Sequence, residues 1–122
     1  MMVEITDEFM KAMLGKSRTY TALLLRTTAK YKPDAPPDSE QRRIIWEHGR
    51  RNFQLRESGV MPIVGPLLKP PYAGLAIFVV SAEETKEIMQ GDPAVIAGYF
   101  EFEILPWRSF PGDLLTDPRF DV

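Results

Sequence analysis

Residues 72–105 read YAGLAIFVVSAEETKEIMQGDPAVIAGYFEFEIL, and this stretch decides the fold that we predict. Its first nine residues are aliphatic, aromatic or small, which is typical of a buried strand. Ser81 is followed three residues later by Glu84, the pattern of a capping box at a helix start. Asp92-Pro93 then places an N-capping residue before a proline, which predicts a further helical turn. Residues 99–105 alternate apolar side chains with glutamate, as in a strand with one face exposed to water.

The segments before this stretch complete an alternating order. Residues 19–28 (TYTALLLRTT) predict a first strand, and residues 60–68 (VMPIVGPLL) predict another, interrupted by Gly65-Pro66. Between them, Asp38 or Ser39 caps a long helix that runs to about Ser58 and ends at Gly59. The order strand–helix–strand–strand–helix–strand predicts a ferredoxin-like α+β domain, built as a β-α-β-β-α-β unit.

The two ends of the chain lie outside that unit. Thr6 is positioned to cap a short helix through Leu14, which Gly15 would end. Its apolar stripe would consist of Phe9, Met10, Met13 and Leu14, and we expect it to pack on the domain or on a neighbouring subunit. We therefore predict an N-terminal helical extension (1–18), a ferredoxin-like domain (19–107) and an extended C-terminal tail (108–122) draped on a partner.

The composition restricts the classes of function. The 122 residues suffice for one domain, and 44% hydrophobic with 26% charged residues is ordinary for a globular protein. A formal net charge of −2 gives no electrostatic basis for binding nucleic acid or an anionic membrane. No apolar run approaches the ~20 residues that span a bilayer. Because the acidic N-terminus lacks the pattern of a secretory signal, we expect a cytoplasmic protein.

His48 is the only histidine and the first candidate catalytic residue. Imidazole has an unperturbed pKa of about 6.5, so it can exchange a proton near neutral pH. Spacings of three and four residues place His48 on one helix face with Ile44, Ile45, Asn52 and Leu55, so we expect it to face the sheet and line a cavity. The alternative is a core histidine that is satisfied by a backbone partner.

Asp92 is the candidate partner of His48. A carboxylate beside an imidazole N–H holds the ring in one tautomer and raises its basicity, which suits removal of a proton next to a carbonyl. The alternative is a simple helix N-cap, whose oxygen accepts from backbone N–H groups. Both roles can hold at once, because capping needs only one carboxylate oxygen.

Other kinds of chemistry find little support in the sequence. The absence of cysteine excludes disulfides, thiolate nucleophiles and zinc knuckles. There is no nucleophile-elbow, phosphate-loop or dinucleotide-binding motif, so we expect no cofactor. One histidine and scattered acids predict no metal site. Five arginines on the long helix suit an anionic ligand, although a solvated face with nearby glutamates explains them more simply. These arginines are Arg42, Arg43, Arg50, Arg51 and Arg56.

The joint spacing of several short motifs resembles that of the YCII-related (YciI-like) family. The matching positions are His48, Gly59, Gly65-Pro66, Asp92-Pro93, Ala97-Gly98 and Pro106-Trp107. They span roughly residues 19–107, and their spacing is more specific than any one of them. The resemblance implies a dimeric α+β barrel, in which two ferredoxin-like units face each other with their sheets and each keeps a pocket between sheet and helix. It also implies that His48 and Asp92 form an acid–base dyad.

We therefore expect a small acid–base enzyme of the lyase, isomerase or dehalogenase type that acts on a small cyclic or enolisable metabolite. The candidate substrate-binding residues are Gly65, Pro66, Trp107 and Asn52. The main alternative is a non-catalytic module for small-ligand binding or dimerisation. A cofactor-free monooxygenase of the same barrel type is a third possibility, with no residue that marks an oxygen site.

We also expect a homodimer or a higher homo-oligomer. One sheet face is covered by the two main helices, and the remaining chain is too short to cover the other. The other face must be covered too if it carries any of four apolar candidates, namely Leu23, Leu25, Ile77 or Val79.

Overall fold

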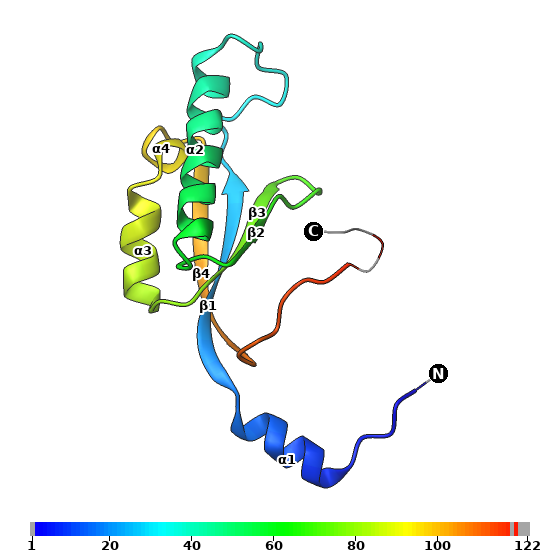
Figure 1. Cartoon of the computed structure of the whole chain (residues 1–122). Coiled ribbons are helices and arrows are strands. Elements are labelled where there is room, and N and C mark those ends of the chain that lie inside the picture. Colours follow the sequence, from blue (N-terminus) through cyan, green and yellow to red (C-terminus); the bar gives the residue numbers. More distant parts are fainter. Residues whose placement is uncertain (1, 118, 120–122) are drawn as a thin grey trace. The chain divides into compact units, whose positions relative to one another are not determined.

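The computed structural model of the chain describes residues 2–117 and 119 (Figure 1). It divides into two compact units. Tyr20–Trp107 form the larger unit, and Met1–Thr19 together with Arg108–Val122 form the smaller one.

A four-stranded antiparallel sheet organises the larger unit. Its strands are β1 (Arg18–Thr27), β2 (Ile63–Gly65), β3 (Tyr72–Phe78) and β4 (Phe100–Ser109), arranged in the order β2-β3-β1-β4. Strand β3 pairs with both β1 and β2, and places Leu75 opposite Leu24 of β1. The first and third strands are therefore central, with the last strand beside the first, and the predicted ferredoxin-like α+β fold is confirmed.

The helices α2 (Glu40–Glu57) and α3 (Ala82–Gln90) lie side by side on one side of this sheet, and the short α4 (Pro93–Ile96) follows α3 (Figure 1). Between sheet and helices lies the hydrophobic core, which excludes water from the apolar side chains of both layers. Its buried residues are Leu23, Leu25, Met61, Ala76, Phe78, Met89, Ala94, Tyr99 and Phe100.

The two faces of the sheet differ from the expectation in one respect. Leu23 and Leu25 were candidates for the uncovered face, but both lie in the core under the helices. Because successive side chains of a strand alternate between faces, Leu24 of β1 and its partner Leu75 lie on the other face. Leu75 is 39% exposed there. Alternation also places Ile77 on that face, where it is 9% exposed, whereas Val79 lies beyond the end of β3.

Prolines shift two strand boundaries. The predicted strand 60–68 shrinks to the three residues of β2, since Pro62 and Pro66 on either side of it lack a backbone donor. Strand β4, by contrast, does not end at Leu105 but continues through Pro106-Trp107 to Ser109. A proline is tolerated there because β4 is an edge strand, with one row of backbone groups unpaired by the sheet.

Local caps define most helix ends as the sequence predicts. The hydroxyl of Ser39, rather than Asp38, accepts from the Arg42 amide at 3.2 Å and begins α2. Gly59 follows the end of α2 with φ +84°, and Gly98 adopts the same φ after α4. This left-handed conformation favours glycine and turns the chain out of each helix.

The smaller unit contains α1 (Asp7–Gly15), which Thr6 caps by accepting from the Phe9 amide at 3.1 Å. Gly15 is the last residue of the helix rather than a residue beyond it. No residue of α1 is buried. The packing of the apolar stripe of α1 on the domain or on a neighbouring subunit stays a prediction.

The cap of α3 provides a direct test of these local signals. The hydroxyl of Ser81 accepts from the Glu84 amide at 3.1 Å. We predict that Ser81→Ala lowers the free energy of unfolding by about 1 kcal/mol, and Ser81→Gly by only a few tenths. Urea denaturation measures both. An alanine variant as stable as the wild type would contradict the role of this cap.

Candidate acid–base site

His48 of α2 and Asp92 at the start of α4 form the centre of the site. The Nδ1 atom of His48 lies 2.7 Å from Oδ1 of Asp92. Asp92 is fully buried and His48 is 9% exposed. The predicted contact between the two side chains is thus present, and the partner of this ring nitrogen is a carboxylate rather than a backbone group.

The second oxygen of Asp92 caps α4. Oδ2 accepts from the backbone amides of Ala94 at 3.0 Å and Val95 at 3.2 Å. Asp92 therefore acts as a helix cap and as the histidine partner at the same time, with one oxygen in each role. Because two backbone amides hold Oδ2, the direction in which Oδ1 faces the imidazole is fixed by the backbone.

Asn52 contacts the other nitrogen of the imidazole. Its Nδ2 lies 3.2 Å from Nε2 of His48, one helical turn along α2. A carboxylate only accepts hydrogen bonds and an amide nitrogen only donates them. A ring with its hydrogen on Nδ1 satisfies both contacts, since it donates to Asp92 and accepts from Asn52 at Nε2. Both ring nitrogens are therefore bonded within the chain.

Two further residues complete the surroundings of the dyad. The ring of Phe100, in β4, lies edge-on to the imidazole with centroids 5.1 Å apart, so His48 faces the sheet as predicted. The guanidinium Nη1 of Arg51 is 4.0 Å from Oδ1 of Asp92 and places a positive charge beside the carboxylate. This Nη1 is buried, and no hydrogen-bond partner is seen for it among the described residues.

Arg51 is the residue that sequence reasoning missed, because it was grouped with the solvated arginines of the helix. Its spacing of three residues from His48 was the available signal, since residues three apart share a helix face. Gly91 makes room for it: a Cβ atom at Gly91 would lie 3.0 Å from Nη2 of Arg51.

The remaining candidates for substrate binding lie at the two edges of the sheet. Gly65 ends β2 and Pro66 follows it, whereas Trp107 belongs to β4 and packs 6.4 Å from the ring of Tyr20. Strands β2 and β4 are the two edges of the sheet, three strand spacings or about 14 Å apart. Of the four residues named for this role, Asn52 is the one seen in contact with His48.

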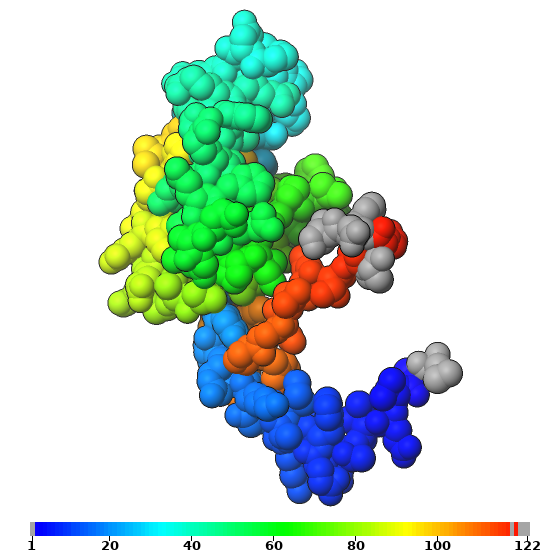
Figure 2. All heavy atoms as spheres, in the orientation of Figure 1, coloured from blue at the N-terminus to red at the C-terminus, as the bar shows by residue number. Residues whose placement is uncertain are grey.

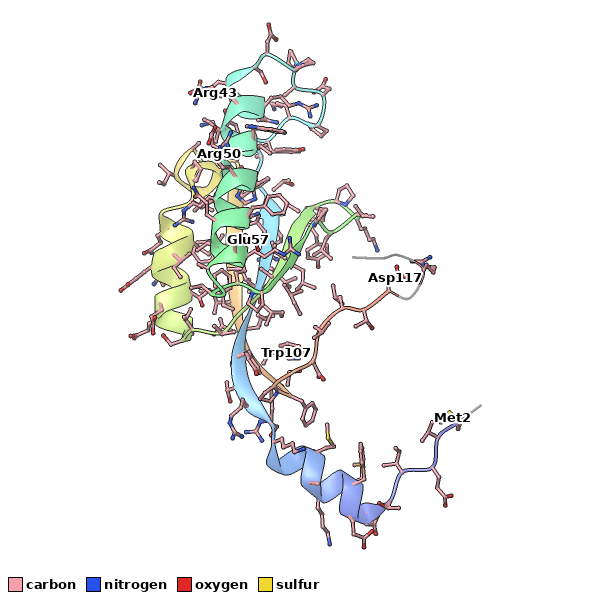
Figure 3. All side chains as sticks on the ribbon, viewed as in Figure 1. Met2, Arg43, Arg50, Glu57, Trp107 and Asp117 are labelled. Carbon is pink, nitrogen blue, oxygen red and sulfur yellow. The ribbon has the colours of Figure 1, made fainter. Side chains whose placement is uncertain are left out.

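A large groove lies on the side of α2 that faces away from the sheet. Its volume is about 1110 Å³, and its lining includes Arg42, Ile45, Trp46, Gly49, Arg50 and Phe53. Figure 3 shows that Arg43, Arg50 and Glu57, which also line it, follow one another along α2. His48 does not belong to this lining. The expectation that His48 lines a cavity is therefore not supported by this groove and stays a prediction.

The structure shows neither a metal-binding cluster nor a membrane-spanning helix in the part of the chain that it describes. Within residues 2–117 and 119, no three His, Cys, Asp or Glu side chains gather as ligands. No helix in the same ranges combines the length and the apolar character needed to cross a bilayer.

A family model for the YCII-related domain matches residues 24–108. The matched span contains His48, Asn52 and Asp92, together with β2, β3 and the helices between β1 and β4. A search of curated proteins found no match.

Proposed function

We propose that this chain, which belongs to the YCII-related family, is a small cytoplasmic acid–base enzyme. Its substrate would be a small cyclic or enolisable metabolite, and its reaction of the lyase, isomerase or dehalogenase type. The observation that carries the proposal is the 2.7 Å contact between Nδ1 of His48 and a carboxylate that the start of α4 holds in place. Such a carboxylate keeps the imidazole in one tautomer and leaves Nε2 as the base.

In the proposed reaction, Nε2 of His48 removes a proton from a carbon next to a carbonyl group. The C–H electron pair forms the enolate, and the negative charge of Asp92 stabilises the resulting imidazolium. The proton then returns to a different carbon in an isomerisation, or the enolate electron pair expels a leaving group in a lyase or dehalogenase reaction. A general base of this kind contributes about 10²- to 10⁴-fold in rate.

Asn52 has two roles in the proposed reaction. Because its amide occupies Nε2 at 3.2 Å, a substrate must displace it before the base can act. The displaced amide then lies close to the reacting carbon and can donate to the enolate oxygen. We therefore propose Asn52 as a substrate-binding residue. The same role for Gly65, Pro66 and Trp107 stays a prediction.

Deuterium exchange tests the proposal without knowledge of the natural substrate. A panel of small cyclic and open-chain ketones is incubated with the protein in D2O, and loss of the α-proton signal is followed by NMR. We expect exchange of at least one panel member, reduced about 10²- to 10⁴-fold in His48→Gln. Gln54→Ala, an exposed change on the same helix, is the matched control and should exchange at the wild-type rate. Equal rates for His48→Gln and wild type would contradict the catalytic role.

A second candidate is a non-catalytic small-ligand-binding or dimerisation module. It is favoured by the observation that both ring nitrogens of His48 have partners within the chain. In that case no panel member exchanges its α-proton, and His48→Gln changes only the stability of the fold.

We also propose that the chain forms a homodimer through the sheet face opposite the helices, where Leu24 lies beside Leu75. A charge in such an apolar interface is costly to desolvate. We predict that Leu75→Arg weakens this interface, so that light scattering finds a lower average mass than for the wild type at the same concentration. The exposed α3 change Glu87→Arg, away from this face, should leave the dimer mass unchanged. A wild-type mass of 13.9 kDa at all micromolar concentrations would contradict the dimer.

A further inference from the structure

The groove along α2 exposes two large aromatic side chains with a gap between them. Trp46 is 71% exposed and Phe53 is 60% exposed. They are seven residues apart, so both lie on one side of the helix, and Gly49 lies between them. A Cβ atom at Gly49 would meet no heavy atom within 4 Å, so packing inside the chain does not require a glycine there. The missing side chain leaves a gap in which a second backbone can approach α2 closely.

Helix α1 has the complementary character. No residue of α1 is buried, and its apolar side chains Phe9, Met10 and Leu14 are about half exposed. With Met13 they form one stripe, the pattern by which an amphipathic helix binds in an apolar groove. The nine residues of α1 extend about 13 Å, and the seven-residue step from Trp46 to Phe53 covers about 10 Å. Helix α1 is therefore long enough to cover the exposed part of the groove.

The charges of the two surfaces are also complementary. Three acidic residues, Glu4, Asp7 and Glu8, lie before or at the start of the stripe, and the first basic residue of the chain is Lys11. The groove is lined by Arg42, Arg43 and Arg50, against two acidic residues. Figure 2 shows that the surface of α2, coloured cyan to green, is open along the near face.

We propose that this groove binds α1 of a second copy of the chain. The helix of the same copy is excluded by chain length, because only Lys16 and Ser17 separate α1 from β1. The Cα atoms of Gly15 and Arg18 are joined by three steps of 3.8 Å, so they lie about 11 Å apart at most. The groove lies on the side of α2 away from the sheet, and a helix with its side chains is about 10–12 Å across. A linker of this length cannot carry α1 from a strand of the sheet to the far side of α2. If two copies exchange their α1 helices, the apolar stripe of α1 and the groove along α2 are both covered in each copy.

Trp46 itself reports whether the groove is occupied. One variant, the acceptor chain, supplies the groove. It carries Trp107→Phe, so that Trp46 is its only tryptophan. It also carries Phe9→Glu and Met10→Glu, which make its own α1 too polar to bind in a groove. The donor chain carries Trp46→Phe and Trp107→Phe, so it has no tryptophan signal but keeps α1 intact. We expect an excess of donor to shift the emission of Trp46 to the blue and to protect it from iodide quenching. A donor that also carries Phe9→Glu and Met10→Glu should have no effect.

Gly49 supplies the matched test on the groove side. In the acceptor chain, Gly49→Leu should abolish the shift because it fills the gap, whereas Gly49→Ala should reduce it less. Circular dichroism checks that both variants are folded, as the open space around Gly49 predicts. If Gly49→Leu fails to fold, the two donors alone decide the question. The proposal is overturned if the intact donor causes no shift, if both donors cause the same shift, or if a folded Gly49→Leu acceptor still responds.

Discussion

Replacement of Asp92 by asparagine should lower catalysed α-proton exchange by about 10²- to 10⁴-fold while the chain stays folded. Asparagine has nearly the same size as aspartate, but only one of its two terminal atoms accepts hydrogen bonds. In the wild type both are acceptors: Oδ1 faces His48 and Oδ2 faces the amides of Ala94 and Val95. If the asparagine oxygen keeps the helix cap, its NH2 group faces Nδ1 of His48. The ring hydrogen must then move to Nε2, and the lone pair that removes the substrate proton is lost.

The same assay determines whether the two residues act as one unit. We expect the double variant His48→Gln/Asp92→Asn to exchange as slowly as His48→Gln alone, because the carboxylate has no role once the imidazole is gone. The measurement is the exchange rate of the panel member that responds best to the wild type. Losses that multiply in the double variant would show that the two residues act independently, and a wild-type rate for Asp92→Asn would exclude the dyad.

The local parts of the fold could be predicted from the sequence because their causes lie within a few residues. The caps formed by Thr6, Ser39, Ser81 and Asp92 each join a side chain to a backbone amide two or three positions along the chain. Such contacts depend on residue type and spacing alone. The order of elements follows from these ends, and with it the ferredoxin-like topology.

The side chains of β1 could not be assigned to the two sheet faces from the sequence, for a non-local reason. The run Ala22-Leu23-Leu24-Leu25 is apolar at every position, so it lacks the alternation that identifies a buried face. Its orientation is decided by pairing with β3, which begins 45 residues after Thr27. Phe78 and Ala76 of β3 lie in the core. Because Leu23 pairs with Ala76, its side chain lies on the same face of the sheet.

The candidate site was predictable to the extent that it depends on helix faces and capping. Helical spacing places His48 toward the sheet, and the two oxygens of Asp92 allow a cap and a histidine contact together. Gly65 and Trp107 lie at opposite sheet edges, which is a consequence of the whole β-α-β-β-α-β order and not of the short motifs around these residues. The contacts of Asn52 and Arg51 with the dyad depend on side-chain conformations and on the approach of α4 to α2, which no local pattern specifies.

Asp92→Ala should lower the free energy of unfolding by about 1.5–5 kcal/mol, more than any other single change discussed above. Loss of the cap of α4 costs about 0.5–2 kcal/mol, and leaving the buried N–H of His48 without a partner costs about 1–3 kcal/mol. Urea denaturation measures the sum, and a double-mutant cycle with His48→Leu separates the two contributions. In the leucine background no imidazole is left unpaired, so Asp92→Ala should cost only the cap. The difference between the two backgrounds, about 0.5–3 kcal/mol for residues in contact, is then the contribution of the dyad to stability. The same loss in both backgrounds would mean that the carboxylate stabilises the fold as a helix cap alone.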